Sequence, residues 1–298
     1  MTQTRREFLK TSGSLGGATL LSSFLGGCSG NGNVRVNGHL WIYASKFPPN
    51  WDSTPVLDQV FSDFKYAGIE GVELMEVNLR HNEAMSNIGA LIEKYELPVT
   101  GSSYGGNMWD QTQHQKILED VELVVGRLHQ LGGTNFGITV GNARRKKTED
   151  ELDAQAEILK KILLICDRKD VIANMHNHTF EVENDLHDLK GTISRVPELK
   201  LGPDLNWLIR GGVNPVDFIR TYGKQMVYMH IRDQNADDKW TEYVGEGVTD
   251  FPAIASALQE IDFRGEAAIE LAADIPPVNP MKENWKKSRE YVRQIFGW

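Results

Sequence analysis

From residue 38 onward, short apolar runs alternate with longer amphipathic stretches along the whole chain of 298 residues. The runs have the length of buried strands, and the stretches repeat apolar residues at helical spacing. We expect strands near residues 39–44, 70–75, 97–102, 134–140, 171–176, 199–204, 226–231 and 266–271. We expect helices near residues 54–67, 83–96, 111–131, 148–168, 184–192, 214–222, 250–260 and 281–296.

This alternation predicts an α/β fold with a parallel sheet. Eight strand–helix repeats favour a (β/α)8 barrel, the TIM-barrel architecture, formed by a single domain. A doubly wound open sheet is the alternative, but no G-x-G-x-x-G pattern follows the first expected strand. We find no low-complexity segment and no linker that would divide the domain.

The N-terminus carries two targeting motifs. Thr4–Lys10 reads TRREFLK and matches the twin-arginine export pattern S/T-R-R-x-F-L-K, and a Gly-rich apolar stretch then ends in Leu-Gly-Gly-Cys28, which resembles a lipoprotein processing box. An accidental Arg pair in an ordinary tail is the alternative, but the two motifs stand in the right order. We therefore predict a signal with a lipobox over residues 1–28, a tether over residues 29–37 and the barrel domain over residues 38–298.

These motifs predict a periplasmic or cell-envelope lipoprotein that is exported by the twin-arginine translocase. Acyl chains on Cys28 would hold the protein at the membrane. The twin-arginine route carries folded proteins, so a metal could be loaded before export. Past the signal, no apolar stretch is long enough to cross a bilayer as a helix.

Composition excludes one class of partner. The formal net charge is −9, and an acidic surface repels the phosphates of nucleic acids.

With Cys28 assigned to lipid, Cys166 is the one remaining cysteine, so we expect no intramolecular disulfide and a buried thiol. The basic run 144–147 is expected to be a solvated face. The oligomeric state stays open, with a homo-oligomer among the alternatives.

Carboxylates and imidazoles stand at or just past the ends of the last four expected strands. They are His176, His178 and Glu181 after the fifth, Asp204 after the sixth, His230 on the seventh and Glu270 on the eighth. Active-site groups of α/β barrels gather at these strand ends, and such side chains are ligands for divalent cations. The sequence therefore predicts a metal site at the mouth of the barrel.

The alternation of side chains along each strand supports this site. Alternate residues share one face of a strand, so His230 and Glu270 should face the barrel axis while Met229 and Ile269 face the helices. Asp204 and His176 should also point inward. Buried charges are tolerated only where they are paired, hydrated or metal-bound.

Several phrases of the sequence carry a resemblance to a family. They are "MHNHTFE", "GPDLNWLIRGG", "MHIRDQ", "VGEGVTDFPAI" and "FRGEAAIEL", preceded by "LWIYASKFPP" and "GIEGVELM". Together they resemble the xylose-isomerase-like TIM barrels known as sugar phosphate isomerases/epimerases. The resemblance extends over nearly the whole chain after the signal.

The resemblance implies one divalent metal ion, most often Mn²⁺, with Co²⁺, Mg²⁺ or Zn²⁺ as alternatives. Relatives bind it through a Glu-Asp-His-Glu quartet, which by position is Glu181, Asp204, His230 and Glu270. Many relatives instead have a Glu on the fifth strand itself, where this chain has His176, and a His three residues after the Asp, where this chain has Trp207. The first ligand therefore stays open between Glu181 and His176.

The implied substrate is a small-molecule carbohydrate. Indole rings would stack on the sugar, and cationic groups would bind its hydroxyls or a developing enolate. The residues expected to contact it are His176, His178, Trp109, Trp207, Arg232, Glu246 and Lys46. Trp41 is a further candidate for stacking, and Glu73 for the floor of the site.

Four functions fit these features. The first is a metal-dependent isomerase or epimerase of a non-phosphorylated sugar or keto-sugar, with an enediolate formed between Glu181 and Glu270 as acid and base. The second keeps the site but expels a glycosidic oxygen by β-elimination, as a 3-keto-glycoside lyase or hydrolase. The third is a non-catalytic sugar-binding lipoprotein. The fourth, an abasic-site endonuclease on the same barrel, is disfavoured by the net charge.

Overall fold

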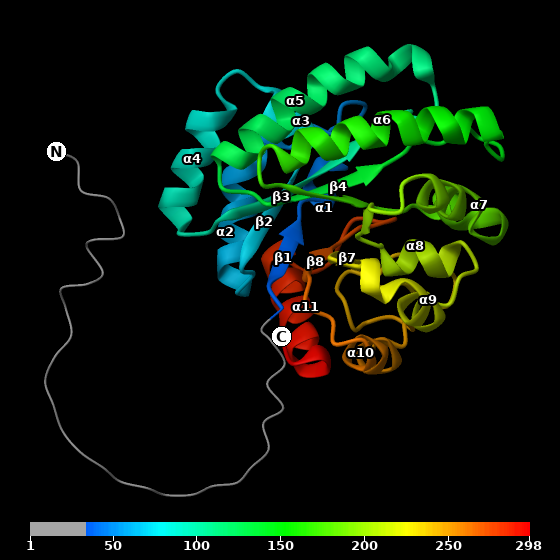
Figure 1. Ribbon diagram of the computed structural model, residues 1–298. Helices are drawn as coiled ribbons and strands as arrows, with labels where there is room; N and C mark the ends of the chain where they lie inside the picture. Colours follow the sequence, from blue (N-terminus) through cyan, green and yellow to red (C-terminus); the bar gives the residue numbers. More distant parts are fainter. Residues whose placement is uncertain (1–33) are drawn as a thin grey trace, which may run out of the picture. The chain divides into compact units, whose positions relative to one another are not determined.

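The computed structural model describes residues 34–298, in which eight parallel strands curl into a barrel (Figure 1). The strands are β1 (Val36–His39), β2 (Gly71–Met75), β3 (Val99–Gly105), β4 (Asn135–Thr139), β5 (Ile172–Met175), β6 (Lys200–Leu201), β7 (Tyr228–Ile231) and β8 (Glu266–Glu270). The twin-arginine motif and Cys28 lie outside the described residues. β1 begins inside the segment expected to be a tether.

The sheet is ordered β6-β5-β4-β3-β2-β1-β8-β7. Parallel bridges between Leu201 and Met226 and between Asp204 and His230 join its two edges, and the N–H of Val227 donates to the carbonyl of Leu201 at 2.9 Å. These contacts bring β6 against β7 and close the barrel. The predicted (β/α)8 architecture is confirmed.

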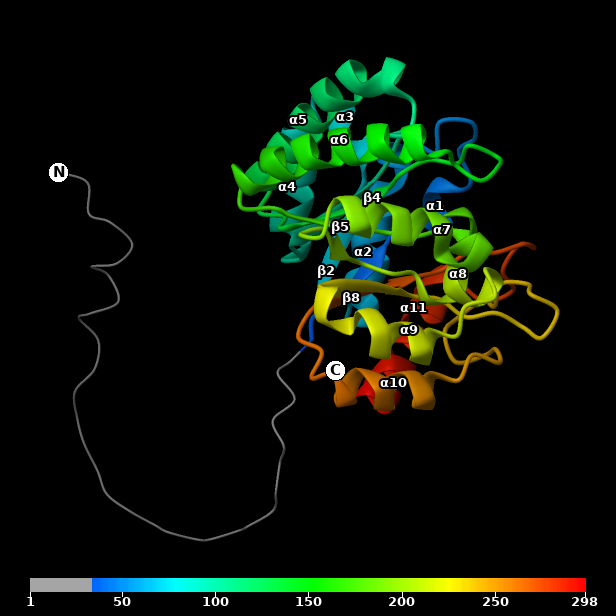
Figure 2. The ribbon, with the colours of Figure 1, turned by 45° about the vertical axis from the view of Figure 1, so that its right-hand side comes forward.

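Helices lie outside the strands in both views (Figures 1 and 2). The longer ones are α2 (Leu57–Ala67), α4 (Ala84–Tyr95), α5 (His114–Gln130), α6 (Glu149–Asp167), α7 (Thr179–Arg195), α9 (Pro215–Tyr222), α10 (Phe251–Glu260) and α11 (Met281–Phe296). Short helices follow three strand ends: α1 (Trp41–Ala44), α3 (Glu76–Arg80) and α8 (Leu205–Arg210). Single 3₁₀ turns are η2 (Thr54–Val56), η3 (Gln111–Gln113) and η4 (Gly223–Gln225). Within residues 34–298 no helix combines the length and hydropathy needed to cross a bilayer.

The first expected strand, 39–44, was wrong. β1 ends at His39, and the apolar residues after it wind into α1, where Ile42, Tyr43 and Ala44 are buried. A short apolar run has no period that separates a buried strand from a buried helix. The true strand contains Asn37 and Gly38, which give no apolar strand signal. Glycine is needed at position 38, because a Cβ there would come within 2.6 Å of the ring of Phe64.

The expected alternation of inward and outward side chains is confirmed on β7. Tyr228 and His230 point into the barrel, where both contact Oε2 of Glu73 at 3.0 and 2.8 Å. Met229 and Ile231 are buried on the other face, among apolar side chains of the core. The interior of the barrel is therefore polar near its mouth, and the apolar core lies between the strands and the helices.

The expectation that the basic run 144–147 forms a solvated face is wrong for Lys147. Lys147 is 5% exposed, and its Nζ lies 2.5 Å from Oδ2 of Asp188 and donates to Oε1 of Gln155 at 2.7 Å. Gln155 in turn donates to Asp188 Oδ1 and to Thr192 Oγ1. The network ties α6 to α7, and burial of Lys147 is tolerated because its charge is paired and hydrogen-bonded.

Candidate metal centre and substrate cavity

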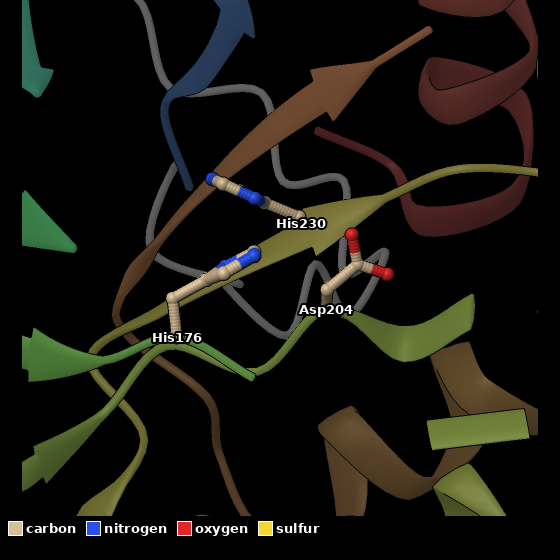
Figure 3. A group of neighbouring side chains, drawn as sticks. All are labelled: His176, Asp204 and His230. Atoms are coloured by element: carbon tan, nitrogen blue, oxygen red, sulfur yellow. The ribbon is translucent and has the colours of Figure 1, made fainter. Parts of the chain in front are cut away.

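Side chains from the ends of β5, β7 and β8 and from the start of α8 converge at the mouth of the barrel. Figure 3 shows the rings of His176 and His230 and the carboxylate of Asp204 turned toward a common centre. One ligand atom of each of these three residues lies within 4.8 Å of those of the others. Glu270 adjoins them, with Oε2 2.9 Å from Nδ1 of His230.

Four buried ligand atoms in this cluster make no hydrogen bond with the described residues. They are Nδ1 of His176, Oδ2 of Asp204, Nδ1 of His230 and Oε2 of Glu270. Nearly all buried polar atoms in folded proteins are hydrogen-bonded. The four come from four successive strand ends, and two imidazole nitrogens with two carboxylate oxygens form a donor set that suits a divalent cation. The residues present therefore fit a metal ion.

Glu73 orients the imidazole of His230, one of these candidate ligands, through the ring nitrogen that does not face the cluster. His230 Nε2 lies 2.8 Å from Glu73 Oε2, which also accepts a hydrogen bond from the hydroxyl of Tyr228 at 3.0 Å. Asn37 Nδ2 donates to that hydroxyl at 3.2 Å. With Nε2–H donated to Glu73, Nδ1 is the nitrogen of His230 that can accept a cation, which is the usual arrangement of a metal-binding His.

Arg232 carries a positive charge into the same cluster. Its Nε lies 2.7 Å from Oδ2 of Asp204, and its Nη2 contacts Oε1 of Glu270. These two atoms, Nε of Arg232 and Oδ2 of Asp204, form an ion pair but no well-aligned hydrogen bond. The guanidinium also lies 5.5 Å from the ring of Trp207 and 5.1 Å from that of Trp240. It thus connects the candidate ligands with the aromatic wall of the cavity.

The charges shift the protonation equilibria of the cluster. Burial, together with the nearby ring of His230, holds the pKa of His176 well below its usual range. Burial opposes ionisation of Glu270, but Arg232 and His39 hold its pKa well below the usual range. Burial also opposes the charged form of His230, but the Glu73 and Glu270 carboxylates raise its pKa to about 10. Neutral His176 and ionised Glu270 are in the forms that bind cations, whereas His230 would release its Nδ1 proton when a metal ion binds.

Glu181, the first residue of the expected metal quartet, takes a different position. Its Oε1 accepts the N–H of Val140 at 3.2 Å, and its Oε2 accepts the N–H of His178 at 2.6 Å as part of a capping box at the start of α7. Burial raises its pKa to about 8. The structure therefore brings together Asp204, His230 and Glu270, with His176 rather than Glu181 beside them.

A cavity of about 330 Å³ opens over the cluster. Its wall is partly aromatic, with Trp41, Tyr104, Trp207 and Trp240, and Glu76 also lines it. Burial raises the pKa of Glu76, although Arg80 lies close by. A concave space with aromatic side chains and a few convergent polar groups is the usual form of a small-molecule site.

Four of the seven residues expected to contact substrate line this cavity: His176, His178, Trp207 and Arg232. The other three are not part of its wall. Lys46 Nζ lies 5.9 Å from the ring of Tyr43, Glu246 Oε2 accepts the N–H of Glu242 at 2.8 Å, and Trp109 follows β3 outside the wall.

Among the wall residues that the sequence reasoning missed are His39, Glu76, Ser103 and Trp240. His39 and Ser103 hydrogen-bond to each other at 3.0 Å, and correct placement of β1 would have shown His39 as a strand end. Glu76 directly follows β2, the same signal that marked Asp204 and Glu270. No pattern marks Trp240, because the path of its loop decides where it lies.

Comparisons with known proteins agree with this architecture. Inosose dehydratase of Clostridium beijerinckii is 21% identical over 279 residues, which cover 84% of this chain and 93% of that protein. The structure of D-allulose 3-epimerase from Methylomonas sp. matches with a TM-score of 0.73 at 16% identity, covering 88% of this chain and 97% of that chain. The structure of 3-keto-D-glucoside 4-epimerase from E. coli matches with a TM-score of 0.68 at 16% identity, covering 88% and 100%.

At these identities the two structures show that the fold is shared. The family assignment rests on the sequence, because the family model described as xylose isomerase-like TIM barrel matches residues 61–295, well over half of the chain. The chain therefore belongs to the xylose isomerase-like TIM barrel family.

Proposed function

We propose that this protein is a divalent-metal-dependent isomerase or epimerase of a sugar or keto-sugar. The observation that carries the proposal is the set of four buried ligand atoms at the mouth of the barrel, none of which makes a well-aligned hydrogen bond within residues 34–298. His176, Asp204, His230 and Glu270 would hold the ion, with His176 in the place first assigned to Glu181. Two nitrogens and two carboxylate oxygens suit Mn²⁺, and Co²⁺, Mg²⁺ and Zn²⁺ are alternatives.

When bound, the ion would supply Lewis-acid stabilisation to a carbonyl of the sugar and its neighbouring hydroxyl. The chain supplies the proton transfers. Glu270 would accept the proton from the carbon next to the carbonyl, and Arg232 would donate hydrogen bonds to the oxygen on which negative charge develops. Glu76, whose pKa is raised by burial, lines the same cavity and would return a proton to the substrate.

β-Elimination is the second candidate outcome at the same site. Glu270 would again take the carbon-bound proton, but a carbon–carbon double bond would then form as the neighbouring C–O bond breaks. The departing oxygen would take a proton from an acid such as Glu76. The similarity to a dehydratase favours this alternative, and the similarity to a 3-keto-D-glucoside epimerase is in keeping with a keto-sugar substrate. Analysis of the products separates isomerisation from elimination.

Metal content tests the proposal and identifies the first ligand. Wild-type protein purified without chelator should hold about one divalent ion per chain, as mononuclear sites do, when measured by inductively coupled plasma mass spectrometry. His176→Ala should lose the ion because a ligand is removed. Glu181→Gln is the matched control and should keep it, because Glu181 binds backbone N–H groups.

The reverse result, an ion kept in His176→Ala and lost in Glu181→Gln, would restore the quartet expected from the sequence. Wild-type protein that binds sugar and holds no metal would contradict the proposal and favour a non-catalytic sugar-binding protein. Thermal denaturation of both variants would show whether a lost ion reflects a lost ligand or a lost fold.

We also propose that residues 1–28 direct export by the twin-arginine route and that Cys28 carries the lipid anchor. The two sequence motifs support this proposal. In a Gram-negative host, the full chain should label with a palmitate analogue and fractionate with membranes, and Cys28→Ala should lose both properties. Arg5→Lys/Arg6→Lys should leave the chain in the cytoplasm. Unchanged labelling of the Cys28 variant would contradict lipidation at this residue.

A further inference from the structure

An aromatic strip leads out of the substrate cavity. Trp41, at the start of α1, lines the cavity, and its ring centroid lies 5.5 Å from that of Trp51 with 51° between the ring planes. Trp51 is not part of the cavity wall and is 38% exposed. The two indoles therefore continue the aromatic surface from the cavity onto the exterior. Large exposed aromatic side chains beside a cavity often belong to a binding surface.

The segment that carries Trp51 is held in place by hydrogen bonds. The N–H of Trp51 donates to the carbonyl of Phe47 at 2.8 Å. The next residue, Asp52, accepts the N–H of Thr54 at 3.0 Å and lies 2.9 Å from Nε2 of His81. The backbone that carries the exposed indole is thus fixed before any ligand binds, which lowers the entropic cost of binding.

The backbone of Trp51 is also unusual. Its φ of 55° lies in the left-handed region, which bulky residues rarely adopt. Residues in such conformations cluster at functional sites, where the surrounding structure maintains them. Trp51 covers part of its indole against Trp41 but leaves 38% of the residue exposed, so packing alone does not account for a bulky residue in this conformation, and the exposed part of the ring is free to contact a ligand.

We propose that Trp41 and Trp51 form a second sugar-binding subsite, the aromatic rim, which takes the next ring of a glycoside whose reacting ring lies in the cavity. The inference rests on the proposed function. The cavity, of about 330 Å³, lies at the small end of ligand pockets and suits one sugar ring. A second ring would extend past Trp41 and meet Trp51. The substrate class is therefore a disaccharide or other glycoside rather than a free monosaccharide.

Calorimetric titration of the full chain with glucose, cellobiose, maltose and sucrose tests the aromatic rim. At least one disaccharide should bind more tightly than glucose. Trp51→Ala should weaken that binding by about 3- to 10-fold, the range expected from loss of one stacking contact, and should leave glucose binding unchanged. Tyr66→Ala is the matched control, since Tyr66 is an exposed aromatic on α2 that bonds to Glu283.

Equal binding of glucose and all three disaccharides would overturn the subsite, as would a Trp51→Ala variant that binds every sugar like the wild type. Equal weakening of glucose and disaccharide would also overturn it, because Trp51 would then act on the cavity as a whole. Dissociation of an oligomer in Trp51→Ala, seen by light scattering, would assign the indole to a contact between copies instead. Metal content is measured on the same samples. A metal-bound protein that fails the disaccharide test would contradict the aromatic rim alone, whereas a metal-free protein would contradict the proposed function.

Discussion

Replacing Glu270 by Gln should lower turnover by about 10²- to 10⁴-fold, the range for loss of a general base. The substitution removes the carboxylate that would both bind the metal and accept the carbon-bound proton. It also leaves Arg232 and His39 facing a neutral amide, since both lie against Oε1 of Glu270. Exchange of the substrate's carbon-bound proton with D₂O, followed by NMR, measures the proton-transfer step directly.

The matched control for this variant lies on the same strand. Glu266→Gln changes a carboxylate at the opposite end of β8, where Oε2 accepts a hydrogen bond from Asn37. Exchange in this variant should stay close to the wild-type rate, because Glu266 is remote from the cavity. Exchange at the wild-type rate in Glu270→Gln would show that another residue of the cavity wall is the general base, and Glu76 and His178 would then be tested.

Replacing Arg232 by Gln should destabilise the metal-free protein by about 3–5 kcal/mol, the usual cost of breaking a buried ion pair. Arg232 is 4% exposed and lies between Asp204 and Glu270, so its removal takes away the ion-pair partner of Asp204 and, alongside His230, one of the two cations that contact Glu270. Mn²⁺ should stabilise the variant more than it stabilises the wild type, because a bound cation replaces part of the lost positive charge. Urea unfolding of chelator-treated and Mn²⁺-loaded samples measures both effects.

Arg220→Gln serves as the control for Arg232, because Arg220 pairs with Glu260 on the exterior and both side chains are about half exposed. Its unfolding midpoint should change little, since exposed ion pairs add little stability. Equal behaviour of the two Arg variants, with and without Mn²⁺, would show that Arg232 is not the countercharge of the cluster.

The polar cluster could be anticipated from the chain because strand ends and alternation are local signals. His176, Asp204, His230 and Glu270 each stand at or just past a short apolar run, and their spacing turns them inward. Closure of the barrel then brings these strand ends together, as the bridge between Asp204 and His230 shows. The prediction needed only the assumption that parallel strands present their C-terminal ends at one mouth.

Glu181 shows where local signals fail. It lies shortly after the fifth strand, three residues beyond His178, but its two oxygens accept hydrogen bonds from the backbone N–H groups of His178 and Val140. The bond to Val140 joins residues 41 positions apart, so no local pattern reveals it. The same holds for Lys147, which lies in a basic run and is buried because Asp188 and Gln155 meet it from α7 and α6.

The sequence by itself determined the eight-repeat barrel, the inward faces of the last strands and three of the four ligand candidates that lie together. Helix and strand periods and strand ends are properties of contiguous residues, so they can be read along the chain. Tertiary structure alone decided that His176 rather than Glu181 joins the cluster, that Arg232 lies between two carboxylates, and that Trp240 and Trp51 come to the cavity and its rim. Those positions depend on loop paths and on partners distant in sequence, whose contacts form only when the barrel closes.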